Sequence, residues 1–150
     1  MGAYSFLNVQ ASLVGPGGNA NLGYGSGSSE EGITVEMVED KGDTKVGADG
    51  QLMQTLRTSK LGRITVRLLK TSPVNSVLSQ MYAAQSTISS LWGNNVLRIS
   101  DVSRGDVVLA SQVAFTKQPT IVWGKDGNMN EWIFQGNVDY QLGTGAPVAA

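Results

Sequence analysis

Apolar and polar side chains alternate along several short segments of the chain. In the first of them, Val9, Ala11 and Leu13 alternate with polar residues. A two-residue period is typical of a β-strand with one buried face. Gly-, Asp- and Asn-rich turns, such as 103–105 and 124–130, separate the segments. The sequence therefore predicts strands over residues 4–14, 33–39, 51–56, 63–69, 96–100, 106–116 and 131–138.

One segment has a helical period instead. Ser72 is suited to cap a helix and Pro73 to occupy its first position. The apolar residues that follow have the spacing of one helix face: Val74, Val77, Leu78, Met81 and Tyr82. The pattern predicts a mainly β protein with one flanking α-helix.

Two segments lack this periodicity. Residues 15–32 are rich in Gly, Ser and Asn, with too few apolar side chains to offset the entropy of ordering them. We expect a flexible loop there and a disordered tail over 143–150. The length of 150 residues fits a single domain spanning 1–150.

The composition argues against most catalytic chemistry. The chain contains neither Cys nor His, which removes thiol nucleophiles, histidine bases and the usual zinc ligands. Its 11 basic and 12 acidic residues give no positive excess for stable DNA binding. No apolar run approaches the roughly 18 residues that span a bilayer. We therefore expect no cofactor, no metal, no membrane anchor and no enzymatic activity.

Several motifs admit a functional and a structural interpretation. Glu36, Glu39 or Asp43 could form an acid–base pair across a cleft, but a solvated strand edge is the simpler interpretation. Trp123 and Trp132 could bind a sugar in a monomeric β-sandwich, although a subunit interface is favoured for both.

Three short motifs are attributed to turns. Arg104-Gly105-Asp106 has turn residues between two strands. Asp126, Asn128 and Asn130 have the spacing of calcium ligands, but Gly127 comes too early and no bidentate Glu follows. The glycines of 23–27 lack the Gly-Lys-Ser/Thr of a phosphate-binding loop.

The charged residues are distributed unevenly. Seven acidic residues lie within twenty positions: Glu30, Glu31, Glu36, Glu39, Asp40, Asp43 and Asp49. Five basic residues follow: Arg57, Lys60, Arg63, Arg67 and Lys70. Within a monomer such charges would pair or be solvated, whereas between copies they would steer association and fix its register. A head-to-tail contact of this kind can close into a ring.

Residues 62–85 resemble the strand-then-helix signature of the tail tube proteins of contractile bacteriophages, with the pattern G-x-x-T-x-x-L-x-x-(T/S)-S-P-x-N-x-x-L. The matching residues are Gly62, Thr65, Leu68, Thr71, Ser72, Pro73, Asn75 and Leu78. Residues 38–51 resemble the charged hairpin of that family. Residues 130–143 resemble its closing W-x-F-x-G strand.

The resemblance implies a tail-tube-type β-sandwich or barrel subunit. Six such subunits form a ring with a continuous inner β-barrel, and rings stack into a tube that conducts DNA into the host. The implied partners are other copies of the chain and the sheath, tape measure, baseplate and tail terminator proteins, in a virion assembled in the bacterial cytoplasm. A tail terminator or baseplate-hub protein of the same fold is the alternative.

Two sets of residues are candidates for the surfaces of such a tube. The polar faces of the presumed inner strands would line the lumen: Thr34, Glu36, Gln51, Thr65 and Arg67. The charged hairpin and the residues after it would contact neighbouring subunits or rings: Glu39, Asp40, Asp43, Asp49, Arg57, Lys60 and Arg63.

Overall fold

The computed structural model describes residues 9–23, 28–101, 104–121, 123–125 and 129–143. These residues form a mainly β structure with one α-helix, as the sequence predicts. In chain order the elements are β1 (Val9–Gly15), β2 (Gly18–Asn21), β3 (Ser28–Met37), β4 (Gly42–Val46), β5 (Leu52–Leu56), β6 (Leu61–Leu69), α1 (Val74–Thr87), the short 3₁₀ helix η2 (Ser89–Leu91), β7 (Asn95–Asp101), β8 (Asp106–Lys117) and β9 (Met129–Gln141).

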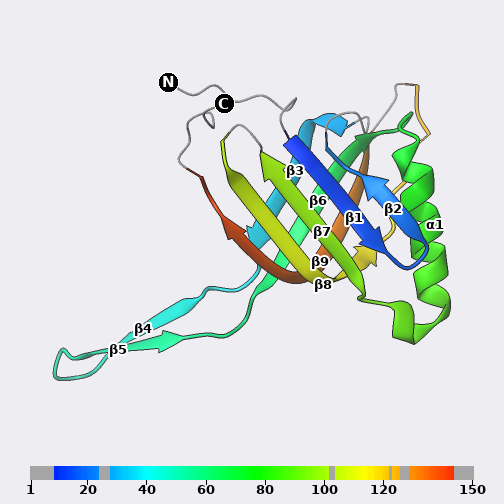
Figure 1. The fold of residues 1–150 in the computed structure, drawn as a ribbon. Coiled ribbons are helices and arrows are strands. Elements are labelled where there is room, and N and C mark those ends of the chain that lie inside the picture. Colours follow the sequence, from blue (N-terminus) through cyan, green and yellow to red (C-terminus); the bar gives the residue numbers. More distant parts are fainter. Residues whose placement is uncertain (1–8, 24–27, 102–103, 122, 126–128, 144–150) are drawn as a thin grey trace.

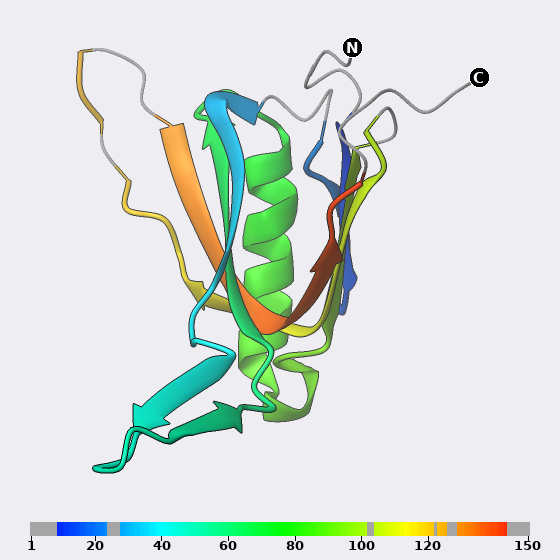
Figure 2. The ribbon, with the colours of Figure 1, turned by 90° about the vertical axis from the view of Figure 1, so that its left-hand side faces the viewer.

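Seven strands form one antiparallel sheet in the order β2-β1-β7-β8-β9-β6-β3. The sheet bends through its long central strands, so that β1 and β7 lie in one layer and β3 and β6 in another (Figures 1 and 2). Helix α1 runs along one side of the opening between the layers, next to β2. The result is a sandwich made from a single sheet, with β2 and β3 at its two edges.

The bend coincides with irregular pairing between β8 and β9. Their register shifts between Ser111 and Ala114, and Gln112 has a φ of 54°, which is unusual for a residue other than glycine. Such bulges bend a strand and increase its twist. Opposite the bulge, a Cβ at Gly136 would lie 2.9 Å from Ser111 O and Val113 Cα, so glycine is needed there. The bulge and Gly136 together let the sheet fold back on itself.

The core fills the space between the two layers and α1. Every second side chain of β1, β6, β7 and β9 points into it, together with Leu78 and Met81 of the helix. Phe115 lies at its centre, with its ring centroid 4.9 Å from that of Phe134 and 5.9 Å from that of Trp132. The alternation seen in the sequence is thus the burial pattern of the strands.

A buried amide pair joins the helix to the sheet. Gln85 of α1 and Asn95 of β7 are both fully buried. Their side-chain amides donate to each other's oxygens at 2.7 and 2.8 Å, Gln85 also donates to Pro16 O at 2.9 Å, and Asn95 donates to Val113 O at 2.9 Å. Buried amides that are satisfied in this way fix the position of α1 against the turn between β1 and β2.

The structure differs from the sequence prediction in three elements. Residues 15–32 are not one loop: they contain β2 and the start of β3, and only 24–27 lie outside the described residues. β4 forms between the predicted strands 33–39 and 51–56, where no strand was expected. Helix α1 begins at Val74, one residue later than predicted, although Ser72 Oγ still accepts a hydrogen bond from Val74 N at 3.3 Å. Apart from Gly143, the predicted tail lies outside the described residues.

Candidate functional site

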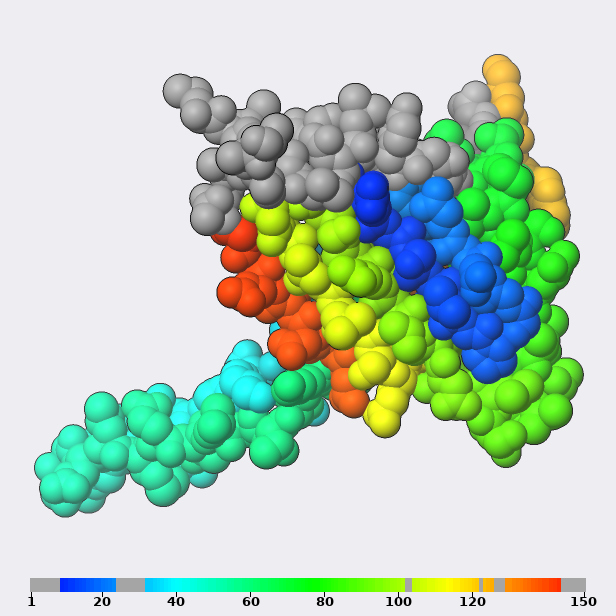
Figure 3. Space-filling model, in the orientation of Figure 1, coloured from blue at the N-terminus to red at the C-terminus, as the bar shows by residue number. Residues whose placement is uncertain are grey.

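The most prominent surface feature is the hairpin formed by β4 and β5. It projects from the body of the molecule, away from both layers of the sandwich (Figures 1 and 3). Its turn is closed by a hydrogen bond from Gly47 N to Gln51 O at 2.7 Å, with Gly50 at a φ of 85°. Nearly all of its side chains are exposed. A two-stranded hairpin is marginally stable by itself, so contact with another surface would stabilise this one.

The two faces of the hairpin differ in chemistry. On one face, Val46 pairs with Leu52, Thr44 with Gln54 and Gly42 with Leu56; we call this the uncharged face. The opposite face, which we call the charged face, presents pairs Asp43–Thr55 and Lys45–Met53. The aliphatic residues of the uncharged face were not among the predicted contact residues. Their alternation on either side of the turn at 47–50 was the signal that could have found them.

The predicted contact residues lie on the hairpin and at its base, where several pair within the subunit. Arg57 Nη2 lies 4.0 Å from Asp43 Oδ2, and Lys60 Nζ lies 3.6 Å from Asp139 Oδ2. Asp49 Oδ1 accepts a hydrogen bond from Gln51 N at 3.1 Å within the turn. Such exposed ion pairs contribute at most about 1 kcal/mol each.

The remaining members of the predicted contact set also lie near the base of the hairpin. Arg57 Nη1 donates to Asp40 O at 3.4 Å, and Glu39 is exposed beside it. Arg63 belongs to β6 and pairs with a residue of β3. No partner chain is needed to explain these contacts, and the role of the set between subunits stays a prediction.

Four of the five predicted lumen residues lie on one polar face of β3 and β6. Thr34 pairs with Thr65 across the two strands. Arg67 Nη1 donates to Thr34 Oγ1 at 2.8 Å, and its Nε lies 3.3 Å from Glu131 Oε2 of β9. We call this surface the polar face. Glu131, the partner of Arg67, was not predicted, because the pairing of β6 with β9 is not visible in the sequence.

The other charges of the polar face are also paired, but Gln51 is not part of it. Arg63 Nη1 lies 3.2 Å from Glu36 Oε1. Both arginines of the face therefore have a glutamate partner, and the face has no positive excess. Gln51 lies instead at the turn of the hairpin, with its backbone bonded to Gly47. The structure thus separates Gln51 from the residues with which it was grouped.

The motif of residues 62–78 joins β6 to α1, and two of its polar members, Ser72 and Asn75, make hydrogen bonds there. Asn75 Nδ2 donates to Leu69 O at 2.9 Å and to Ser72 O at 3.2 Å, while its Oδ1 accepts from Trp132 Nε1 at 3.0 Å. Asn75 therefore fastens the strand-to-helix turn to β9. Leu68 and Leu78 belong to the core. The motif specifies a connection in the fold.

The two tryptophans do not form a joint binding surface. Trp132 is only 3% exposed and packs in the core, whereas Trp123 is 81% exposed. The predicted interface role is therefore wrong for Trp132, because the strand that carries it lies between β6 and β8 and turns this side chain inward. Lys70 Nζ lies 5.3 Å from the centre of the Trp123 ring. A sugar platform built from both rings is excluded.

Of the motifs attributed to turns, residues 104–106 lie within the described part of the chain and the others lie at least partly outside it. Arg104 and Gly105 lie in the turn between β7 and β8, with Gly105 at a φ of 80°, and Asp106 begins β8, with its Oδ1 accepting from Gly143 N at 2.7 Å. That prediction is confirmed. Asp126 and Asn128 lie outside the described residues. The described part of the chain contains no cluster of three or more acidic or metal-ligating side chains that could hold a metal.

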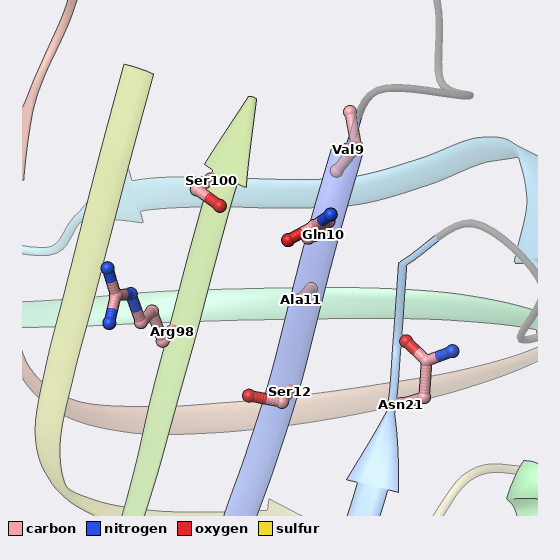
Figure 4. Close-up of a pocket in the computed structure, with 7 residues that line it drawn as sticks. All are labelled: Val9, Gln10, Ala11, Ser12, Asn21, Arg98 and Ser100. Atoms are coloured by element: carbon pink, nitrogen blue, oxygen red, sulfur yellow. The ribbon is translucent and has the colours of Figure 1, made fainter. Parts of the chain in front are cut away.

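A groove of about 630 Å³ crosses the outer surface of β1, β2 and β7 (Figure 4). Its polar side chains are Gln10 and Ser12 of β1, Asn21 of β2, and Arg98 and Ser100 of β7. Arg98 is the one charged residue in this lining, so the groove offers no acid–base pair.

Within the described ranges, no helix is long and apolar enough to cross a membrane.

Solved structures with a similar fold come from contractile injection systems. The tube-terminating cap of the anti-feeding prophage covers 95% of this chain and 93% of its own, with a TM-score of 0.57 and 12% identity. A chain of the PVC extracellular contractile injection system sheath–tube complex covers 90% and 88%, with a TM-score of 0.56 and 14% identity. The PVC sheath/tube terminator has a TM-score of 0.57 and 13% identity over 93% of this chain and 96% of its own. The fold is therefore that of tube and terminator proteins.

The family follows from the sequence. Residues 1–143 match the model of the bacteriophage PhiTE tail tube protein family. No curated protein sequence matches the chain. The chain belongs to this tail tube family, and it is a structural component of a phage tail, as the resemblance implied.

Proposed function

We propose that this chain is the subunit of a contractile phage tail tube, in which six copies form a ring and the rings stack around a channel. The subunit acts through its shape and its contacts and catalyses no reaction. DNA passes through the channel into the host. The observation that carries the proposal is that the polar face lies on β6 and on β3, which is an edge strand of an open sheet.

An edge strand of this length leaves backbone N–H and C=O groups without partners in the sheet. β3 pairs with β6 on one side, and among the described residues no strand follows it on the other. Such an edge invites pairing with another chain unless it is covered. In a closed ring each edge would lie against a neighbouring subunit, and the polar faces would join into one inner surface.

The charges of the polar face suit a channel that DNA passes through. Arg63 is paired with Glu36, and Arg67 with Glu131. An unpaired arginine would bind phosphate and release counterions, which would hold the DNA in place. Because each arginine here faces a glutamate, we assign Thr34, Glu36, Thr65 and Arg67 to the lumen.

We assign the projecting hairpin to contacts between subunits or rings, because it extends beyond the body of its own subunit (Figure 3). The neighbouring folds come from a sheath–tube complex and from terminators, which supports a sheath and a terminator as partners of the finished tube. Tape measure and baseplate proteins complete the expected set. Assembly would take place in the bacterial cytoplasm.

A second candidate is a tail terminator, which would cap the tube without polymerising. Two of the similar solved structures are a terminating cap and a terminator, which favours this candidate over a sugar-binding or enzymatic role. The two candidates differ in one measurable property. A tube subunit stacks without limit, whereas a terminator stops at one ring.

The test is negative-stain electron microscopy of the purified protein over a concentration series, together with sedimentation velocity. The tube role predicts hollow tubes of uniform diameter whose length grows with concentration. Single rings that never stack would favour the terminator. A species that stays monomeric at every concentration would contradict both.

A further inference from the structure

The uncharged face of the hairpin is an aliphatic surface that its own subunit leaves uncovered. Val46, Leu52 and Leu56 are among the most exposed large hydrophobic residues of the described chain. Between them lies the neutral pair of Thr44 and Gln54, whose side chains bond to each other at 2.6 Å. Exposed apolar side chains gathered on one face of a projecting element mark a site of association.

A second aliphatic surface lies on the outer side of the sandwich layer that contains β1 and β7. Val14 of β1 pairs with Val96 of β7, and Leu109 of β8 pairs with Arg98. The outer patch, as we call it, consists of the exposed residues Val14, Val96, Val107 and Leu109. Its charged neighbours are Arg98 and Asp139, on either side of Leu109. Like the uncharged face of the hairpin, this patch presents exposed aliphatic side chains from paired β-strands.

One subunit cannot bring these two surfaces together. The hairpin leaves the body between β3 and β6 and points away from the layer of β1 and β7, which carries the outer patch (Figures 1 and 2). The backbone on both sides of the hairpin is fixed by the pairing of Met37 with Gly62. A contact between the two surfaces therefore requires two copies.

We propose that the uncharged face of the hairpin packs on the outer patch of a second copy of this chain. The proposal rests on the proposed function, since it names the partner and the face of the hairpin that was assigned to contacts between subunits. The charged face then stays in contact with solvent, where Asp43 and Arg57 pair with each other. Burial of aliphatic side chains on both partners drives the contact and also stabilises the hairpin.

Two adjacent residues provide a matched pair of variants. Leu52 and Met53 are consecutive in β5 and similarly exposed, at 63% and 56%, but they lie on opposite faces. We expect Leu52→Asp to raise the concentration needed for polymerisation by about tenfold or more, because it places a charge in an apolar contact. Met53→Asp should change it by less than about twofold. Circular dichroism checks that both subunits fold. Equal effects of the two variants would overturn the proposal.

A cross-linking experiment locates the receiving surface. The natural chain has no Cys, so each introduced thiol is unique. Leu52→Cys and Leu109→Cys subunits are mixed and treated with a short bismaleimide, and the covalent dimer is measured by gel electrophoresis. We expect a strong heterodimer band, and a weak one when Met53→Cys replaces Leu52→Cys. Equal yields from the two mixtures would show that the outer patch does not receive the uncharged face.

The outcomes separate this proposal from the function on which it rests. If the natural protein forms tubes but the Leu52→Asp variant polymerises equally well, the docking face is wrong and the tube role stands. If the natural protein forms no tubes while the Leu52 and Leu109 thiols cross-link selectively, the contact is supported and the tube role fails.

Discussion

Gly62 lets β6 lie close to β9 near the point where the sheet bends. It pairs with Gly136, and a Cβ added to it would overlap the side chain of Val138. We predict that Gly62→Ala lowers the free energy of unfolding by about 1–3 kcal/mol, because the extra methyl group overpacks a buried site. Urea unfolding of the subunit, monitored by circular dichroism, measures this loss.

Val138→Ala is the matched partner of that substitution. Alone it should also destabilise, since it removes methyl groups from a residue that is almost completely buried. In the double variant the smaller residue makes room for the new Cβ, so the two losses should sum to less than their separate values, with a coupling of about 0.5–3 kcal/mol. Strictly additive losses would mean that Val138 is not what excludes a side chain at position 62.

The sequence singles out some residues without showing which contacts they make. Gly62 and Asn75 were found through a motif, while the overlap with Val138 and the bond to Trp132 depend on β9, which is distant in the chain. The sequence predicts an interface position for both Trp123 and Trp132, because their local contexts are similar. Burial is decided by the strands that flank a residue, so the sequence alone could not separate them.

At the scale of single elements, α1 depends on a polar contact as well as on its apolar face. Gln85→Leu would remove the hydrogen bonds that Pro16 O and Asn95 Oδ1 accept from Gln85, and would leave Asn95 Nδ2 with its bond to Val113 O alone. An unsatisfied buried polar group costs about 1–3 kcal/mol, so we predict a loss of at least about 2 kcal/mol in the free energy of unfolding. The measurement is again urea unfolding. Gln80→Leu, at an exposed position of the same helix, is the control and should change stability little.

The elements that the sequence predicts are those whose apolar residues recur at a regular period, including the short strands over 51–56 and 96–100. β6, β8, β9 and α1 alternate or repeat clearly, and the structure has them within a few residues of the expected bounds. β2 and β4 are short and rich in Gly and polar residues, so they have little local preference for a strand. They form because β1 and β5 supply hydrogen-bond partners. Pairing of that kind cannot be recognised in a single segment.

At the scale of the whole molecule, the fold changes the meaning of the charge pattern. The acidic segment is followed closely by the basic one in the sequence, and this pattern suggests two complementary patches for contacts between subunits. Folding places β3 beside β6 and closes the hairpin, so that Glu36 meets Arg63 and Asp43 meets Arg57 within one subunit. The sheet order that brings these strands together could not be deduced from local periodicity. The aliphatic side chains of the uncharged face of the hairpin, by contrast, stay exposed in the subunit.

Salt dependence of assembly distinguishes these two kinds of contact. Raising NaCl from about 0.1 to about 1 M shortens the screening length from about 10 to about 3 Å, which weakens attraction between exposed charges. It does not weaken apolar burial. We therefore predict that the polymerised fraction, measured by sedimentation, stays constant or rises over this range. The Leu52→Asp variant should remain defective throughout. Tubes that dissolve at high salt would instead assign the contact to the charged residues Asp43, Asp49 and Arg57, and would return the charged face of the hairpin to the interface.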